Sequence, residues 1–221
     1  MGDLGFSIVE DVLSRQECQA LANALESLGA RRRRAGARNL MSKPAISAIA
    51  YDSRLLHLAA NTLSAPAVPF RATLFDKSRT SNWHVLWHQD RSLPLSRRLH
   101  SAEWGPWSTK SGVLYALAPA WALERVVALR IHIDPSTNDN GALRVIPASH
   151  KAGVLSSAEI LRATSAVPPR TCVVERGGVL AMRPLLLHSS MKASDNQLRR
   201  VLHIEYANGL DLGNDIRLCV A

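Results

Sequence analysis

Hydrophobic residues recur with helical spacing in the first third of the chain. Ser14 and Glu17 have the spacing of a capping box, in which each side chain bonds to the other's backbone at a helix start. We expect this first helix to end at Gly29, where the chain can turn away. A second helix is predicted from about Ile46 to Leu63, before two prolines. The apolar stripe of the first helix consists of Cys18, Leu21, Ala22, Leu25 and Leu28.

From residue 70 onward, short runs rich in β-branched and aromatic residues replace the helical pattern. Turn signals at Asn138–Gly141 and Arg176–Gly178 separate some of these runs. Successive strands without long helices between them predict a mainly β fold with flanking helices, a double-stranded β-helix of the jelly-roll or cupin-like kind. A short strand is also expected at Phe6–Val9. The predicted barrel strands are 71–75, 83–87, 111–114, 126–133, 142–146, 171–174, 179–182 and 201–206.

The length of 221 residues suits one domain with a full hydrophobic core. The chain has no internal repeat and no linker-like segment. We therefore predict one domain over residues 1–221, with a helical flank at about 14–65 and the barrel at about 70–207.

Composition narrows the location that we expect. No run of about 18 apolar residues predicts a membrane span, and the first residues do not resemble a secretory signal. The three cysteines are too few and too scattered for a disulfide framework. These features favour a protein of the cytoplasm.

The chain is basic, with 27 Lys and Arg against 18 Asp and Glu, a net charge of 27 − 18 = +9. The excess gathers at Arg31–Arg34, Arg97–Arg98 and Arg199–Arg200. Such patches attract anions, and a substrate with a negative charge is compatible with them. For Arg31–Arg34, a solvated basic loop is the favoured interpretation over a specific phosphate site.

The most informative motif is Trp87-His88-Gln89-Asp90, which His188 follows one hundred residues later. In a strand, residues two apart face the same side, so His88 and Asp90 can point into the barrel while Gln89 points away. His188 follows the apolar run Leu185–Leu187, which we interpret as a strand that leads to a polar loop. Two histidines and one carboxylate make a facial triad for Fe(II) that leaves positions open for a cosubstrate and oxygen.

A second triplet, His132-Ile133-Asp134, has the same spacing and lies on a convincing predicted strand. His132 is 188 − 132 = 56 residues from His188, and His88 is 188 − 88 = 100 residues from it. Both separations can bring strands together in a barrel. Spacing alone therefore leaves both triplets open.

Further motifs accompany the first triplet. They are 74–78 (LFDKS), 82–83 (NW), 128–134 (ALRIHID), 140–150 (NGALRVIPASH), 182–188 (MRPLLLH) and 199–206 (RRVLHIEY). Together with 87–90 and in this order, these blocks resemble the phytanoyl-CoA dioxygenase family of Fe(II)/2-oxoglutarate oxygenases, especially its small bacterial-type members. The blocks cover most of the chain, so the resemblance is specific for fold and cofactor and much less so for substrate.

The resemblance implies roles for individual residues. It makes His88, Asp90 and His188 the iron ligands, and Arg199, eleven residues after the last histidine, the partner of the distal carboxylate of 2-oxoglutarate. Ser190 matches a position that can add a hydrogen bond to that carboxylate. The implied cofactors are Fe(II), the cosubstrate 2-oxoglutarate and O2. Related halogenases lack the carboxylate ligand, so Asp90 favours hydroxylation.

Other residues are candidates for the pocket. Trp104 and Trp107 follow the triplet in a long connection, where they either form an aromatic wall for substrate or anchor the loop. Arg130 is central in its predicted strand, and an inward arginine requires a substrate anion or an internal acid as its partner. His84 shares the phase of His88 if the strand has no bulge. Weaker candidates for cosubstrate contact are Lys77, Asn82 and His84.

The expected function is hydroxylation of an unactivated C–H bond in a small molecule, with release of succinate and CO2. Three alternatives remain. A nucleic-acid demethylase would suit the net charge of +9, although no base-flipping insertion is evident. A non-enzymatic metal-binding or small-molecule-binding barrel would show no turnover, and a cupin-type enzyme would use the metal without 2-oxoglutarate. The acyl-CoA, free acid and amino acid classes all stay open as substrates.

Overall fold

Two antiparallel sheets face each other and form the barrel. The computed structural model describes residues 2–27, 36–78, 81–195 and 197–221. Its larger sheet has six strands in the order β1-β11-β8-β13-β3-β2. These strands are β1 (Phe6–Val9), β2 (Gly36–Ala37), β3 (Val68–Lys77), β8 (Val126–His132), β11 (Val179–Met182) and β13 (Arg199–Ala207).

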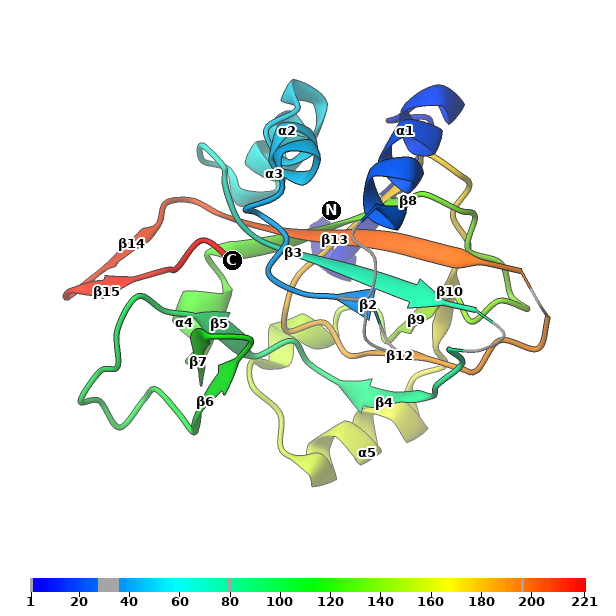
Figure 1. Cartoon of the computed structure of the whole chain (residues 1–221). Coiled ribbons are helices and arrows are strands. Elements are labelled where there is room, and N and C mark those ends of the chain that lie inside the picture. Colours follow the sequence, from blue (N-terminus) through cyan, green and yellow to red (C-terminus); the bar gives the residue numbers. More distant parts are fainter. Residues whose placement is uncertain (1, 28–35, 79–80, 196) are drawn as a thin grey trace.

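The smaller sheet has the strand order β10-β9-β12-β4. It faces the larger sheet on the side opposite the helices α1, α2 and α3 (Figure 1). Its neighbouring strands pair antiparallel, as in the larger sheet. This arrangement confirms the predicted jelly-roll fold. The four strands are β4 (Val85–His88), β9 (Leu143–Val145), β10 (Arg170–Cys172) and β12 (His188–Ser190).

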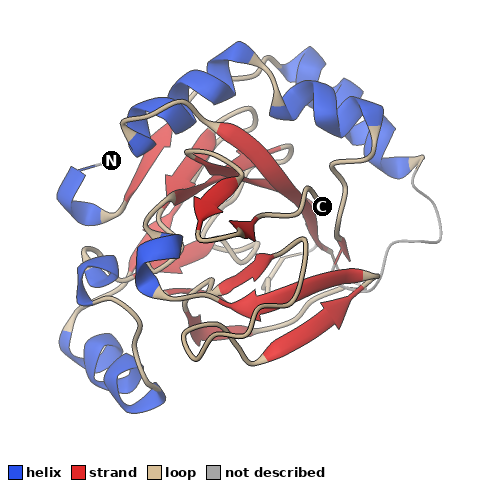
Figure 2. Ribbon diagram, turned by 90° about the vertical axis from the view of Figure 1, so that its left-hand side faces the viewer, coloured by secondary structure: helices blue, strands red, loops and turns tan. Residues whose placement is uncertain are grey.

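Helices and two small sheets surround the barrel, and Figure 2 shows the helices on the outside of the strands. The small sheets contain β5 (Ser92–Pro94), β6 (Trp107–Lys110) and β7 (Val113–Leu117), and β14 (Asp211–Gly213) and β15 (Ile216–Arg217). The helices are α1 (Arg15–Glu26), α2 (Pro44–Ala50), α3 (Ser53–Leu63), α4 (Ala120–Leu123) and α5 (Ser157–Ala166), with 3-10 turns at Gly2–Leu4 and Ser149–Ala152.

Alternation along β8 separates the two faces of the larger sheet. Val127, Leu129 and Ile131 belong to the core cluster that also contains the buried residues of α1, α2 and α3. Ala128, between them, packs with residues of β9 and β10 inside the barrel. Arg130 has the same parity as Ala128 and therefore lies on the inner face. The outer face anchors the helices, while the inner face is available for chemistry.

The predicted helices are confirmed in part. The capping box of Ser14 and Glu17 is present, with bonds of 2.7 and 3.2 Å, and the stripe through Leu25 is buried. The single helix expected at 46–63 is wrong, because α2 ends at Ala50 and Asp52 caps a new helix by accepting the N–H of Arg54. Helix α5 was not predicted. Leu28, Gly29 and the run Arg31–Arg34 lie outside the described residues.

Two strand boundaries also differ from the predictions. Leu185–Leu187 forms no strand, because the Leu186 N–H bonds back to the Arg183 carbonyl in a turn, and His188 begins a strand there. Ser111 has a positive φ of 51° and belongs to a turn, so β7 starts at Val113. The larger sheet also recruits β1, which extends the barrel beyond the expected limits of 70–207. Across the described residues, no helix is long and apolar enough to cross a membrane.

Candidate metal centre

Two histidines distant in sequence are direct neighbours in the smaller sheet. His88 is the last residue of β4 and His188 is the first of β12, and the two are paired across the antiparallel strands. Asp90 lies just beyond β4, where its N–H bonds to the Pro184 carbonyl at 2.9 Å. The pairing of β4 with β12 thus brings together residues separated by 100 positions.

The three side chains converge on one point. Asp90 Oδ1 lies 3.7 Å from His88 Nε2, and Asp90 Oδ2 lies 3.5 Å from His188 Nε2. One ligand atom from each residue falls within 4.8 Å of the others. The two imidazole rings are 4.1 Å apart between centroids and tilted by 55°. This is the only such group of potential metal ligands among the described residues.

Backbone carbonyls hold both imidazole rings in the same tautomer. His88 Nδ1 donates to the Leu86 carbonyl at 2.8 Å, and His188 Nδ1 donates to the Leu186 carbonyl at 2.9 Å. A carbonyl can only accept, so the proton of each ring is on Nδ1 and the lone pair is on Nε2. Both lone pairs face Asp90, as expected of metal-binding histidines oriented by a second hydrogen bond.

The environment favours the protonation states that bind a cation. Burial lowers the pKa of His188 to about 4, against the opposing effect of Asp90, so this imidazole is neutral at pH 7. Burial by itself raises the pKa of Asp90. The nearby histidines and Arg71 lower this pKa by a larger amount, so that it lies well below its usual range. Two imidazoles and one carboxylate fit an Fe(II) ion.

Gln89 fixes the end of the strand from the side opposite the metal-binding residues. Its amide nitrogen donates to the carbonyls of Gly153 and Leu185, both at 2.8 Å, and its carbonyl accepts the Leu155 N–H at 2.9 Å. The expected alternation of His88, Gln89 and Asp90 is therefore present. The sequence did not indicate that Gln89 itself joins three loops.

Replacing Gln89 by alanine is expected to lower the free energy of unfolding by about 2–4 kcal/mol, because three buried backbone groups lose their partner. Metal affinity is expected to fall about 10-fold, since both flanking ligands move. Urea unfolding and Zn(II) titration measure the two effects. As a control, Leu86→Ala removes a side chain that is 73% exposed and should leave both values nearly unchanged.

The residues of the competing triplet, His132 and Asp134, are engaged in other interactions. Asp134 forms an ion pair with Arg200 at 2.7 Å and a second one with Arg176 at 3.3 Å. His132 Nδ1 is hydrogen-bonded to Ser136 Oγ at 2.9 Å. Asp134 is neutralised by arginines, and no third metal-binding group joins it among the described residues. The structure therefore favours the triplet at His88.

Arg199 begins β13, two residues before the predicted start of this strand, and its side chain is buried inside the barrel. Its Nε donates to the Asn140 carbonyl at 3.2 Å. No carboxylate among the described residues lies within ion-pair distance of it. Burial, together with the nearby charge of Arg130, lowers the pKa of Arg199 to about 9. A buried guanidinium without an acid is suited to an anionic ligand.

Lys77 and Ser190 lie beside Arg199 and contact each other. Lys77 Nζ donates to Ser190 Oγ at 2.9 Å and also to the Met191 carbonyl. The Ser190 hydroxyl donates to the Gly141 carbonyl at 2.7 Å, so its single proton is already engaged. Gly141 has a positive φ of 76°, and a Cβ there would lie 2.5 Å from the Met191 carbonyl oxygen, which explains the glycine. Burial lowers the pKa of Lys77 to about 8, and Arg199 adds to this effect.

The remaining candidates lie in different surroundings. Asn82 exchanges two 2.8 Å hydrogen bonds with the backbone of Ala193 and joins two loops. A bulge interrupts the pairing of β4 with β12, so the condition for His84 to share the phase of His88 is not met, and His84 is exposed. Trp104 is buried and packs edge-on against Trp121, which supports the anchoring role.

Trp107 lies outside the barrel, whereas Arg130 lies inside it. Trp107 starts β6 outside the barrel, and the guanidinium of Arg98 stacks on its ring at 5.7 Å. Arg130 is buried inside the barrel, 5.1 Å from the centre of the Phe75 ring. Of the two partners expected for Arg130, a substrate anion or an internal acid, no internal acid lies within ion-pair distance among the described residues.

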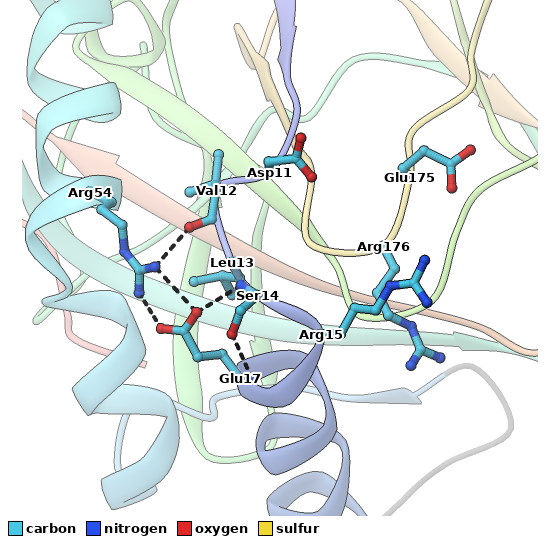
Figure 3. A pocket seen from close by; sticks show the side chains of 9 residues that line it. All are labelled: Asp11, Val12, Leu13, Ser14, Arg15, Glu17, Arg54, Glu175 and Arg176. Atoms are coloured by element: carbon cyan, nitrogen blue, oxygen red, sulfur yellow. Dashed lines mark hydrogen bonds and ion pairs between the residues drawn. The ribbon is translucent and has the colours of Figure 1, made fainter.

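Figure 3 shows a surface pocket of about 530 Å³ whose lining does not include the three metal-binding residues. Arg54 spans it and is already paired with Glu17 and with the Val12 carbonyl. None of the predicted site residues lines it, and it contains no histidine. We therefore place the chemistry at the metal centre. The pocket is lined by Asp11, Val12, Leu13, Ser14, Arg15, Glu17, Arg54, Glu175 and Arg176.

Comparison with known proteins agrees with this geometry. The family model described as phytanoyl-CoA dioxygenase (PhyH) matches residues 3–201, most of the chain. The chain belongs to the phytanoyl-CoA dioxygenase family. This membership confirms the expected enzyme class, an Fe(II)/2-oxoglutarate-dependent oxygenase, with iron and 2-oxoglutarate as its cofactor and cosubstrate. No functionally curated protein matches the chain significantly.

Solved structures of other proteins have a fold similar to that of this chain. AviO1 from Streptomyces viridochromogenes Tue57 is 23% identical, with a TM-score of 0.68 and coverage of 93% of this chain and 90% of AviO1. EctD from S. alaskensis with 2-oxoglutarate and 5-hydroxyectoine is 18% identical (TM-score 0.70, 93% and 72% covered). SnoN, a non-heme α-ketoglutarate-dependent epimerase of nogalamycin biosynthesis, is 16% identical (TM-score 0.69, 94% and 79% covered). At these identities the likeness establishes the fold.

Proposed function

We propose that this oxygenase hydroxylates an unactivated C–H bond of a small molecule, with release of succinate and CO2. The observation that carries the proposal is the convergence of His88, Asp90 and His188 in a barrel that also buries the unpaired cation Arg199. The Asp90 carboxylate occupies the place that a halide would need in a halogenase. Hydroxylation is therefore the favoured outcome of the reaction.

The protein's own groups have distinct tasks in this proposal. His88, Asp90 and His188 hold iron, which supplies oxidising chemistry with O2 and 2-oxoglutarate when bound. Arg199 binds the distal carboxylate of 2-oxoglutarate through charge-assisted hydrogen bonds. Ser190 acts through Lys77, because the lysine donates to its hydroxyl oxygen. Burial of Arg199 excludes water and strengthens the electrostatic attraction.

Exposure of the metal-binding residues supports a small substrate. The His88 side chain is 40% exposed and that of Asp90 28%, whereas that of His188 is only 4% exposed. The open side of the site therefore lies at His88.

We propose that residues 1–221 act as one oxygenase domain, since α1, α2 and α3 share a core with the larger sheet. EctD, whose structure contains 5-hydroxyectoine, gives a precedent for a small substrate.

A screen of small acids, amino acids and acyl-CoA thioesters tests the proposal. We expect one of these classes to increase the release of succinate and to yield a product heavier by one oxygen atom, measured by mass spectrometry. The added atom should come from 18O2. Because SnoN is an epimerase, product mass is the decisive readout. A product of unchanged mass formed together with succinate contradicts hydroxylation.

A further inference from the structure

We propose that β8 supplies a second anion-binding wall to the 2-oxoglutarate pocket, made of the Arg130 guanidinium and the His132 imidazole. The inference rests on the proposed role of Arg199 and extends it to residues that so far have no task in the reaction.

The register of the larger sheet places these residues together. Arg130 and His132 are two positions apart on β8 and face the inside of the barrel. On the neighbouring strand β13, Arg130 pairs with His203 and His132 pairs with Val201. Arg199 lies two residues before Val201 and has the same parity. The wall therefore continues the surface that Arg199 begins.

Each of the two side chains has a buried polar atom without a partner. Arg130 is 5% exposed and His132 is 2% exposed, and Arg130 Nε and His132 Nε2 make no hydrogen bond. Their other ends are engaged, since Arg130 Nη1 is 3.1 Å from His203 Nδ1 and His132 Nδ1 bonds to Ser136. A buried polar atom left unpaired costs about as much as a lost hydrogen bond, so a ligand is the natural partner.

The charges in the pocket do not balance without an anion. No carboxylate among the described residues lies within ion-pair distance of Arg130 or Arg199. Burial lowers the pKa of Arg130 to about 10, which reflects the cost of this charge. Lys77 adds a third cation. Asp90 is the acid that raises the pKa of Arg130, but its two carboxylate oxygens face the two histidines. A dianion such as 2-oxoglutarate complements this surplus better than a monoanion.

Arg71 shows how the barrel treats an inward arginine that has a protein partner. It lies on the inner face of β3 and forms an ion pair with the buried Glu205 of β13. It also donates to the Ser92 carbonyl at 2.7 Å. Arg130 lies in the same sheet and has no such acid. The difference indicates that the partner of Arg130 arrives with a ligand.

The Arg130→Met variant separates ligand binding from packing. We expect 2-oxoglutarate to bind roughly 10- to 100-fold more weakly, the range for losing a hydrogen bond to a charged group. Calorimetric titration of the Fe(II)-loaded protein under anaerobic conditions measures this. Without ligand, the variant should melt at a higher temperature than the wild type, because an unpaired buried charge has been removed.

The matched control is Arg183→Met. Arg183 is half-buried, but its two terminal nitrogens already donate to the carbonyls of Glu124 and Thr62. Its loss should lower the melting temperature and leave 2-oxoglutarate binding unchanged. His132→Phe tests the second member of the wall and should weaken binding up to about 10-fold.

The outcomes distinguish this inference from the proposed function. If wild-type protein does not bind 2-oxoglutarate, the proposed function itself fails. If wild-type protein binds it and Arg130→Met binds it equally well, only the inference is overturned. A fall in melting temperature for Arg130→Met without weaker binding assigns Arg130 to packing and also overturns it. Should Arg130→Met not fold, Arg130→Lys keeps the charge but loses the forked donor geometry, and unchanged binding there has the same meaning.

Discussion

Asp90→Ala is expected to abolish tight metal binding and reduce succinate formation to background. Asp90 contributes the only carboxylate among the three converging side chains, and it lies within 3.7 Å of both imidazole nitrogens. Without it, only two imidazoles face the cation, and affinity should fall by more than about 100-fold, beyond the range for outer-shell changes. Anaerobic Fe(II) titration and a succinate assay measure the two losses.

Asp134→Ala is the matched control, since it removes the acid of the other His-x-Asp triplet. Metal affinity should stay close to the wild-type value. Stability should fall by about 3–5 kcal/mol, because Arg200 is left as a buried charge without its main partner. The reverse result, with metal binding lost in Asp134→Ala and retained in Asp90→Ala, would move the site to His132.

Arg199→Met is expected to weaken 2-oxoglutarate binding by roughly 30-fold to more than 1,000-fold while Fe(II) affinity stays unchanged. Truncating one member of a buried charge pair costs about 2–5 kcal/mol or more, which corresponds to this range. Arg199 does not contact the metal-binding residues, so the iron site should persist. Titration with Fe(II) and then with 2-oxoglutarate separates the two steps.

The adjacent Arg200 provides the control for this variant. Arg200 pairs with Asp134 and with Glu26 of α1, away from the barrel interior. Arg200→Met should therefore destabilise the fold without weakening 2-oxoglutarate binding. If Arg199→Met binds 2-oxoglutarate as the wild type does, Arg199 does not hold the distal carboxylate, and its proposed role is wrong.

Local signals in the sequence predicted local structure well. The capping box at Ser14 located the start of α1. A capping box at Ser156 and Glu159 likewise starts α5, but this helix was not predicted because it lies among segments with strand-like sequence patterns. Asp52 was also a visible N-cap, and the apolar periodicity that runs across it hid the break between α2 and α3.

Features that depend on strand register could not be predicted from the sequence. The two His-x-Asp triplets are equally spaced, and their difference arises from the strands beside them. The smaller sheet pairs His88 with His188, whereas the register of β13 brings Arg200 to Asp134. Likewise, only the structure shows that no acid among the described residues forms an ion pair with Arg130. The resemblance to a family selected the triplet at His88, because the order of the family's motifs reflects this strand pairing.

In the proposed function, iron and 2-oxoglutarate meet at His88, Asp90 and His188. The most direct test adds 2-oxoglutarate to the Fe(II)-loaded protein without oxygen, measures binding, and then admits air and measures succinate. We expect one equivalent of 2-oxoglutarate to bind and slow succinate release to follow even without substrate, with Asp90→Ala inactive in both steps. Protein that binds Fe(II) but neither binds nor converts 2-oxoglutarate would contradict the account.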